Sequence, residues 1–128
     1  MSKPDLGRLE RAVAGLLLPS ESDEPINVVR WEAGGGSVGA EPGDGDALRI
    51  AGCKPGTRVE RTDLDDVFRD GYAGNESARF RDLAGLLASS LDAIRVFRVG
   101  EVEKDILILG RVKAGGGWAG LRSKVVET

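Results

Sequence analysis

The chain has 128 residues, of which 41% are hydrophobic, with one cysteine and no histidine. This length suits one domain with its own core, so we expect a single domain over residues 1–128. The net charge of −3 argues against general affinity for nucleic acids, which requires clustered excess Lys and Arg. The absence of histidine excludes His-based catalytic triads and argues against a conventional zinc site.

Leucines and valines recur at helical spacing in the first eighteen residues, so residues 5–18 are predicted to form a helix that Pro19 ends. Residues 26–32 have apolar side chains on both faces, which is typical of an interior strand. A Gly-rich acidic loop is expected at 33–45, followed by short strands at 48–51 and 57–61.

The second half of the chain begins with a short helix that Thr62 or Asp63 can cap and that extends to Phe68. A loop at 70–75 precedes the strongest helical signal, where apolar residues recur every three or four positions from 80 to 91. Strands are predicted at 94–99 and 105–112, joined by a hairpin, and at 121–126.

Short turns between the last strands predict an antiparallel sheet. The two long amphipathic helices, 5–18 and 80–91, could cover both of its faces. The predicted fold class is therefore α+β, as an α/β/α sandwich with a mostly antiparallel central sheet covered by helices.

Motifs for cofactors and catalysis lack their structural context. The segment from Gly34 to Gly39 matches GxGxxG, but the acidic residues that follow cannot form the helix that would hold a phosphate. Two groups of acidic residues, at 44 and 46 and at 63, 65 and 66, lack the spacing of a calcium loop. Cys53 has no histidine to activate it. We expect no cofactor, no metal ion of its own and no catalytic residue, so the protein is predicted to act by binding and not as an enzyme.

Nothing near the start resembles an export signal, because the longest apolar run there is Ala14 to Leu18. No segment is long enough to span a membrane. The single cysteine is compatible with a reducing compartment, so we expect a cytoplasmic protein.

The acidic residues are concentrated between Ser20 and Asp46. Seven acids and a single Arg30 give this stretch a charge of −6, against −3 for the whole chain. A solvated loop region would explain this composition. The alternative is an acidic surface that steers toward a basic partner, such as the substrate cleft of a nuclease.

The chain closes with Ser123 to Thr128, a strand with an anionic tip. A terminal carboxylate, the side chain of Glu127 and the hydroxyl of Thr128 could together imitate a phosphate in front of a metal ion or a basic pocket.

This closing segment, together with Ala119-Gly120, resembles the closing segment of the nuclease A inhibitor family, whose members block a sugar-non-specific nuclease. Other stretches agree in the same order along the chain: Gly15-Leu16-Leu17 with Ser20-Glu21-Ser22, Trp31-Glu32, and Arg98 to Glu103.

The resemblance implies an α/β/α sandwich that inhibits a metal-dependent, sugar-non-specific DNA/RNA endonuclease. It implies that Thr128 enters the nuclease active site and engages the partner's hydrated magnesium ion, and that Glu21 makes a second anionic contact. We consider Glu127, Asp70 and Tyr72 further candidates for binding the partner.

One departure concerns an interface tryptophan, which the family carries within an Asp-Trp-Tyr run. This sequence has Asp70-Gly71-Tyr72, so that aromatic anchor is missing. The alternative function is a non-catalytic adaptor or regulatory domain of the same fold that binds a different protein. A small ligand-binding domain that uses the Gly-rich loops is the third and least favoured interpretation.

Overall fold

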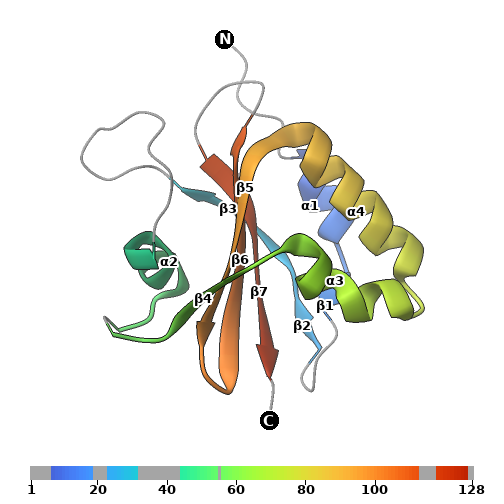
Figure 1. Cartoon of the computed structure of the whole chain (residues 1–128). Helices are drawn as coiled ribbons and strands as arrows, with labels where there is room; N and C mark the ends of the chain where they lie inside the picture. Colours follow the sequence, from blue (N-terminus) through green and yellow to red (C-terminus); the bar gives the residue numbers. More distant parts are fainter. Residues whose placement is uncertain (1–6, 19–22, 32–43, 55, 113–117, 127–128) are drawn as a thin grey trace.

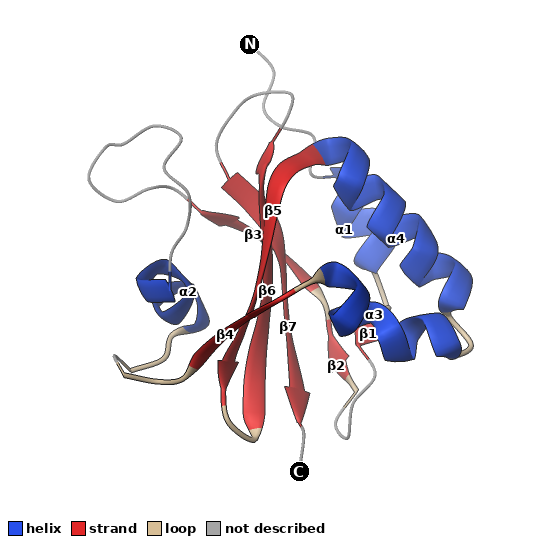
Figure 2. Cartoon of the chain, viewed as in Figure 1, coloured by secondary structure: helices blue, strands red, loops and turns tan. Residues whose placement is uncertain are grey.

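The computed structural model of the chain describes residues 7–18, 23–31, 44–54, 56–112 and 118–126 (Figure 1). A five-stranded antiparallel sheet in the order β3-β7-β6-β5-β4 forms the centre of this part (Figure 2). Its strands are β3 (Asn27–Trp31), β4 (Val59–Thr62), β5 (Leu91–Gly100), β6 (Glu103–Val112) and β7 (Trp118–Val126). A separate two-stranded ribbon consists of β1 (Leu17–Leu18) and β2 (Glu24–Pro25).

Helices cover both faces of the sheet, which confirms the predicted α/β/α arrangement. Three helices lie on one face: α1 (Gly7–Val13), α3 (Leu64–Ala73) and α4 (Ser77–Ser90). Of the described helices, only α2 (Asp44–Ala51) lies on the other face. Side chains alternate along β6, so Ile106 and Ile108 pack with the three helices while Leu107 and Leu109 pack with α2.

The distribution of helices differs from the prediction, because the two long amphipathic helices do not cover opposite faces. α1 and α4 pack against each other on the same face, with Leu9 and Leu83 in one core. The opposite face is covered by α2, in a region where the sequence predicted a strand at 48–51. A run of four residues is too short to show a period, and Ala47 and Ala51 turn out to lie one helical turn apart, both buried on the sheet.

The first helix is shorter than the predicted range 5–18. It ends at Val13, and the Arg79 guanidinium from α4 donates hydrogen bonds to the carbonyl oxygens of Ala12 and Ala14 at 3.0 and 2.8 Å. These bonds satisfy carbonyl groups that the helix end leaves open. The chain then becomes extended, so that Leu16 and Leu18 are buried while Leu17 between them is exposed.

The strand predicted at 26–32 is present as β3, but its predicted interior position is wrong. Among the described strands, β3 pairs only with β7 and so lies at the edge of the sheet. Its apolar residues face both cores, Val28 toward the three helices and Val29 toward α2. The covering helices, not a second neighbouring strand, account for the apolar character of both faces.

The remaining local predictions agree with the structure more closely. Asp63 caps α3, and its side chain accepts a hydrogen bond from the backbone N–H of Asp66 at 2.8 Å. The helix continues past Phe68 to Ala73, so most of the loop expected at 70–75 is helical. In the described part of the chain, no helix is both long and apolar enough to cross a membrane.

Arginines cover two aromatic rings of the core beneath α2. The guanidinium of Arg61 lies 5.6 Å from the centre of the Phe97 ring, and that of Arg111 lies 5.7 Å from the Trp118 ring. Each arrangement pairs a cation with the negative face of a ring. The apolar surface of the sheet is thus shielded where α2 does not cover it.

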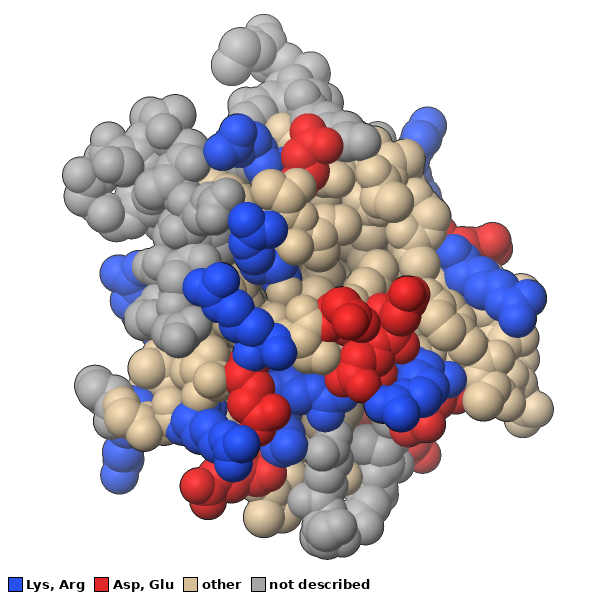
Figure 3. Space-filling model, viewed as in Figure 1, with Lys and Arg blue, Asp and Glu red and all other residues tan. Residues whose placement is uncertain are grey.

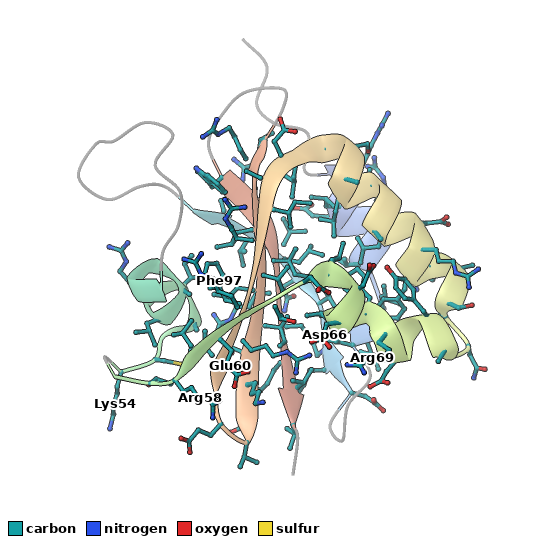
Figure 4. The ribbon with its side chains drawn as sticks, in the orientation of Figure 1. Lys54, Arg58, Glu60, Asp66, Arg69 and Phe97 are labelled. Carbon is teal, nitrogen blue, oxygen red and sulfur yellow. The ribbon has the colours of Figure 1, made fainter. Side chains whose placement is uncertain are left out.

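Asp66 connects α3 to the sheet through ionic hydrogen bonds. Its carboxylate accepts from the Thr62 hydroxyl at 2.8 Å and from the guanidinium groups of Arg98 and Arg69 at 2.6 Å each. The acidic side chains over the start of α3 lie beside basic ones (Figure 3), and Asp66 and Arg69 lie close together (Figure 4). The bond from Thr62, with the charges of the two arginines, holds the pKa of Asp66 below its ordinary value.

We expect Asp66→Asn to lower the free energy of unfolding by about 1–3 kcal/mol, because it removes ionic hydrogen bonds from the half-buried Arg98. The depressed pKa means that this contribution is fully present above the ordinary carboxyl pKa of 3.8 and is lost as pH falls through the lower folded value. Denaturant unfolding of both proteins between pH 7 and pH 2 measures the difference. Asp65→Asn, an exposed change in the same helical turn, is the control, and an equal loss in both variants would contradict the assignment.

Candidate functional site

Three parts of the chain meet at one end of the sheet, which we call the hairpin end. They are the last residues of β7, the turn between β5 and β6, and the ribbon of β1 and β2 (Figure 1). Glu103 at the start of β6 lies opposite Val126, the last residue of β7. The Lys124 ammonium lies 3.5 Å from the Glu103 carboxylate and reinforces this pairing.

The ribbon is attached to β7 by Ser123. Its hydroxyl donates a hydrogen bond to the carbonyl oxygen of Pro25 at 2.8 Å and lies 3.4 Å from that of Glu24. Within the described part of the chain, Ser123 is the one buried polar side chain among apolar core positions. Because a hydroxyl in a core needs a partner, these bonds fix β2 beside the end of β7.

Three of the site residues predicted from the sequence, Glu21, Glu127 and Thr128, lie outside the described residues. The described chain stops before Glu21 at Leu18 and resumes at Asp23, both at the ribbon. It stops before Glu127 at Val126. The segments that contain these three residues are therefore both attached to the hairpin end.

The other two predicted residues, Asp70 and Tyr72, lie in the second half of α3. Asp70 is exposed and free to meet a partner. Tyr72 is half-buried, and its ring packs edge-on against Phe68 with the ring centres 6.1 Å apart. Burial, reinforced by the charge of Asp65, raises the pKa of the Tyr72 hydroxyl. Tyr72 is thus partly a core residue, with only part of its side chain available for binding.

Gly71, at the position of the missing tryptophan, is buried against Phe80. A Cβ atom at residue 71 would lie 2.6 Å from the Phe80 ring, which is closer than carbon atoms can approach. The ring cannot easily move, because it is 1% exposed and packs against Phe68 with ring centres 5.3 Å apart. Position 71 therefore belongs to the core in this protein and cannot present a side chain to a partner.

A groove on the α2 side of the hairpin end was not predicted. The residues that line it are Glu24, Pro25, Asn27, Val29, Asp105, Arg122, Ser123 and Lys124. The Arg122 guanidinium donates to the carbonyl oxygens of Ile50 and Ala51 at 3.2 and 3.0 Å and lies 3.4 Å from Asp105. Arg122 thus satisfies the C-terminal carbonyls of α2 and joins that helix to β7. Side chains alternate between the two faces of the sheet along β7, so Arg122 and Lys124 are expected to share a face. The sequence does not show that α2 covers this face.

Cys53 lies beside this groove, with its sulfur 3.6 Å from a carboxylate oxygen of Asp105. Burial, followed by the nearby Asp105 carboxylate, raises the pKa of the thiol above its ordinary value. The neutral thiol is a poor nucleophile, because the thiolate is the reactive form. Within the described ranges, no three His, Cys, Asp or Glu side chains gather where they could hold a metal ion.

The geometry of the hairpin end suits binding through projecting groups. Asp23, Glu101 and Glu103 are exposed there, beside the paired strands β5, β6 and β7. Such a surface can present anions to a basic partner without large rearrangement.

A family model described as nuclease A inhibitor-like protein matches residues 4–128, which is nearly the whole chain. No curated protein matches the sequence.

We expect Gly71→Ala to lower the free energy of unfolding by about 1–3 kcal/mol, because the added methyl group would overlap the enclosed Phe80 ring. Helix propensity alone predicts the opposite, a gain of up to about 1 kcal/mol. Gly85→Ala is the matched control in α4, where a Cβ atom would meet nothing within 4 Å. Denaturant unfolding compares the two, and equal stabilisation by both changes would refute the close packing of Gly71.

Proposed function

The chain belongs to the nuclease A inhibitor-like family, and we propose from this that it is a stoichiometric protein inhibitor of a metal-dependent, sugar-non-specific DNA/RNA endonuclease. The family match over residues 4–128 is the observation that carries the proposal.

In the proposed mechanism, Thr128 enters the active site of the nuclease, where its hydroxyl and a terminal carboxylate engage the hydrated magnesium ion. Magnesium prefers oxygen ligands and keeps several water molecules, so these groups can bind it directly or through water. Glu21 supplies a second anionic contact, and Glu127 and Asp70 add negative charge near the basic cleft.

The fold supports this proposal through the positions at which two segments leave the described structure. The Ser123–Pro25 hydrogen bond joins the ribbon that flanks Glu21 to the strand that precedes Thr128. Anions from the two segments can then converge on the place that the scissile phosphate would occupy. A metal ion that is held in this way cannot activate water or stabilise the leaving group.

The second candidate function is an adaptor or regulatory domain that binds a protein other than a nuclease. The buried position of Gly71 favours it, because the structure has no room there for the aromatic anchor of the resembling family. A partner that lacks a phosphate-binding metal site would not require Thr128. Titration of a magnesium-dependent nuclease with the wild-type protein and with a variant that lacks Thr128 therefore separates the two functions.

We expect the wild-type protein to inhibit a sugar-non-specific, magnesium-dependent nuclease at a 1:1 ratio, and a variant that lacks Thr128 to bind at least about 30-fold more weakly. The reason is that truncation leaves a desolvated charge unpaired in the interface, at a cost of about 2 kcal/mol or more. Titration of nuclease activity against each protein measures the effect. A third protein with one glycine appended after Thr128 tests whether the carboxylate must belong to Thr128 itself, because the addition moves it one residue further along the chain.

Glu21→Gln is expected to weaken inhibition, whereas Glu10→Gln on the exposed surface of α1 is the matched control and should leave it unchanged. Inhibition that survives the Thr128 deletion would keep the function and reject the mechanism. If no nuclease of this class is inhibited by the wild-type protein, the adaptor function is favoured.

A further inference from the structure

The hairpin between β5 and β6 exposes an apolar side chain at its tip. Val102 is 54% exposed, and among the described residues only Leu17, at 47%, is a comparably exposed large hydrophobic. Glu101 and Glu103 on either side of Val102 are also exposed. We propose that this tip, Glu101–Val102–Glu103, is a further contact with the nuclease, with Val102 as its apolar anchor; this inference rests on the proposed function.

The tip is held in one conformation by its backbone. Gly100 has φ of 121°, and a Cβ atom there would collide with the carbonyl oxygen of Glu103, so only glycine fits. The Gly100 N–H donates a hydrogen bond to the Arg58 carbonyl oxygen at 2.8 Å, and Gly100 pairs with Lys104 across the hairpin. A turn whose backbone is constrained at its base loses less conformational entropy on binding than an unconstrained loop, which favours its use as a contact.

The tip also lies beside the strand that leads to Thr128. Glu103 is opposite Val126 in the sheet, and the Lys124–Glu103 ion pair joins the same two strands. A partner that receives the residues after Val126 would therefore meet the hairpin tip next to them. The contact is continuous with the proposed interface and does not require a second docking surface.

The chemistry of the tip indicates the kind of surface that it fits. A valine between two carboxylates fits a small apolar pocket on the partner that has basic residues around it. The rim of a phosphate-binding nuclease cleft offers such positive charge, and complementary charge increases the rate of association. Lys124 compensates part of the charge of Glu103, which leaves Glu101 as the main anionic side chain of the tip.

The apolar contact through Val102 matters because Gly71 lies in the core. Interfaces usually depend on a few well-buried anchors, and α3 cannot supply one at residue 71. Tyr72 is engaged with Phe68, so only part of its side chain remains available. Val102 is the exposed apolar group of the hairpin end that stands on a fixed turn, and it can take over part of this role.

The test is a titration of a magnesium-dependent, sugar-non-specific nuclease with wild type, Val102→Ser and Ala78→Ser. We expect Val102→Ser to bind about tenfold more weakly, because it removes apolar area that the interface would bury. Ala78→Ser, on the exposed surface of α4, is expected to inhibit like wild type. Equal unfolding midpoints of the variants establish that a weaker inhibition does not arise from misfolding.

Charge reversal provides a second readout. Glu101→Lys is expected to slow association with the nuclease and to change its salt dependence, whereas Glu10→Lys on α1 should change the rate much less. Inhibition by Val102→Ser and Glu101→Lys that equals wild type would overturn the hairpin contact, while loss with the Thr128 deletion would still support the proposed function. If the wild-type protein itself does not inhibit the nuclease, both the hairpin contact and the proposed function are rejected. The titration with wild type distinguishes this outcome from the loss of the hairpin contact alone.

Discussion

The structure depends on β7, the strand that pairs with β3 on one side and β6 on the other. Its nine residues are paired along their whole length, and they contribute to both cores. Leu121 packs with the three helices, whereas Trp118 packs under α2. Because side chains alternate along a strand, a shift of register by one residue would exchange these two sets. The register of β7 thus fixes the sheet, the packing of the helices on its two faces, and the hairpin end.

Polar residues of β7 also attach α2 and the ribbon to the sheet. Arg122 binds the carbonyl groups at the end of α2, and Ser123 binds the ribbon on the opposite face. The Arg122 bonds satisfy carbonyl groups that the end of α2 leaves open, and the Pro25 carbonyl accepts from the hydroxyl of the buried Ser123. The proposed contacts then require no metal site or reactive side chain of their own, since a fixed display of anions is sufficient to occupy a basic cleft.

In α3, a position that the resemblance associates with partner binding lies in the core. Its first turn is held to the sheet by Asp66, Arg98 and Thr62, and its second half lies over Phe80. This close approach is possible because residue 71 has no side chain. Residue 71 therefore cannot carry the aromatic anchor that the resemblance implies, and in the proposed function an apolar contact has to come from another element.

Local patterns in the sequence determined much of the fold. The strands predicted at 94–99, 105–112 and 121–126 and the helical period from 80 to 91 are confirmed by the structure, and Asp63 is the cap of the two predicted candidates that the structure shows. The family resemblance is confirmed by the match over residues 4–128, while Glu21, Glu127 and Thr128 remain predictions from that resemblance.

Only the tertiary structure decided which elements meet. Residues 48–51 are helical because Ala47 and Ala51 fit against the sheet, and β3 is an edge strand whose two apolar faces are covered by helices. The sequence alone also did not predict that Arg79 binds carbonyl groups at the end of α1, that Gly71 lies under Phe80 or that Glu103 lies opposite the last residue of β7. These features are contacts between residues far apart in the chain, and such contacts leave no periodic signal in a single sequence.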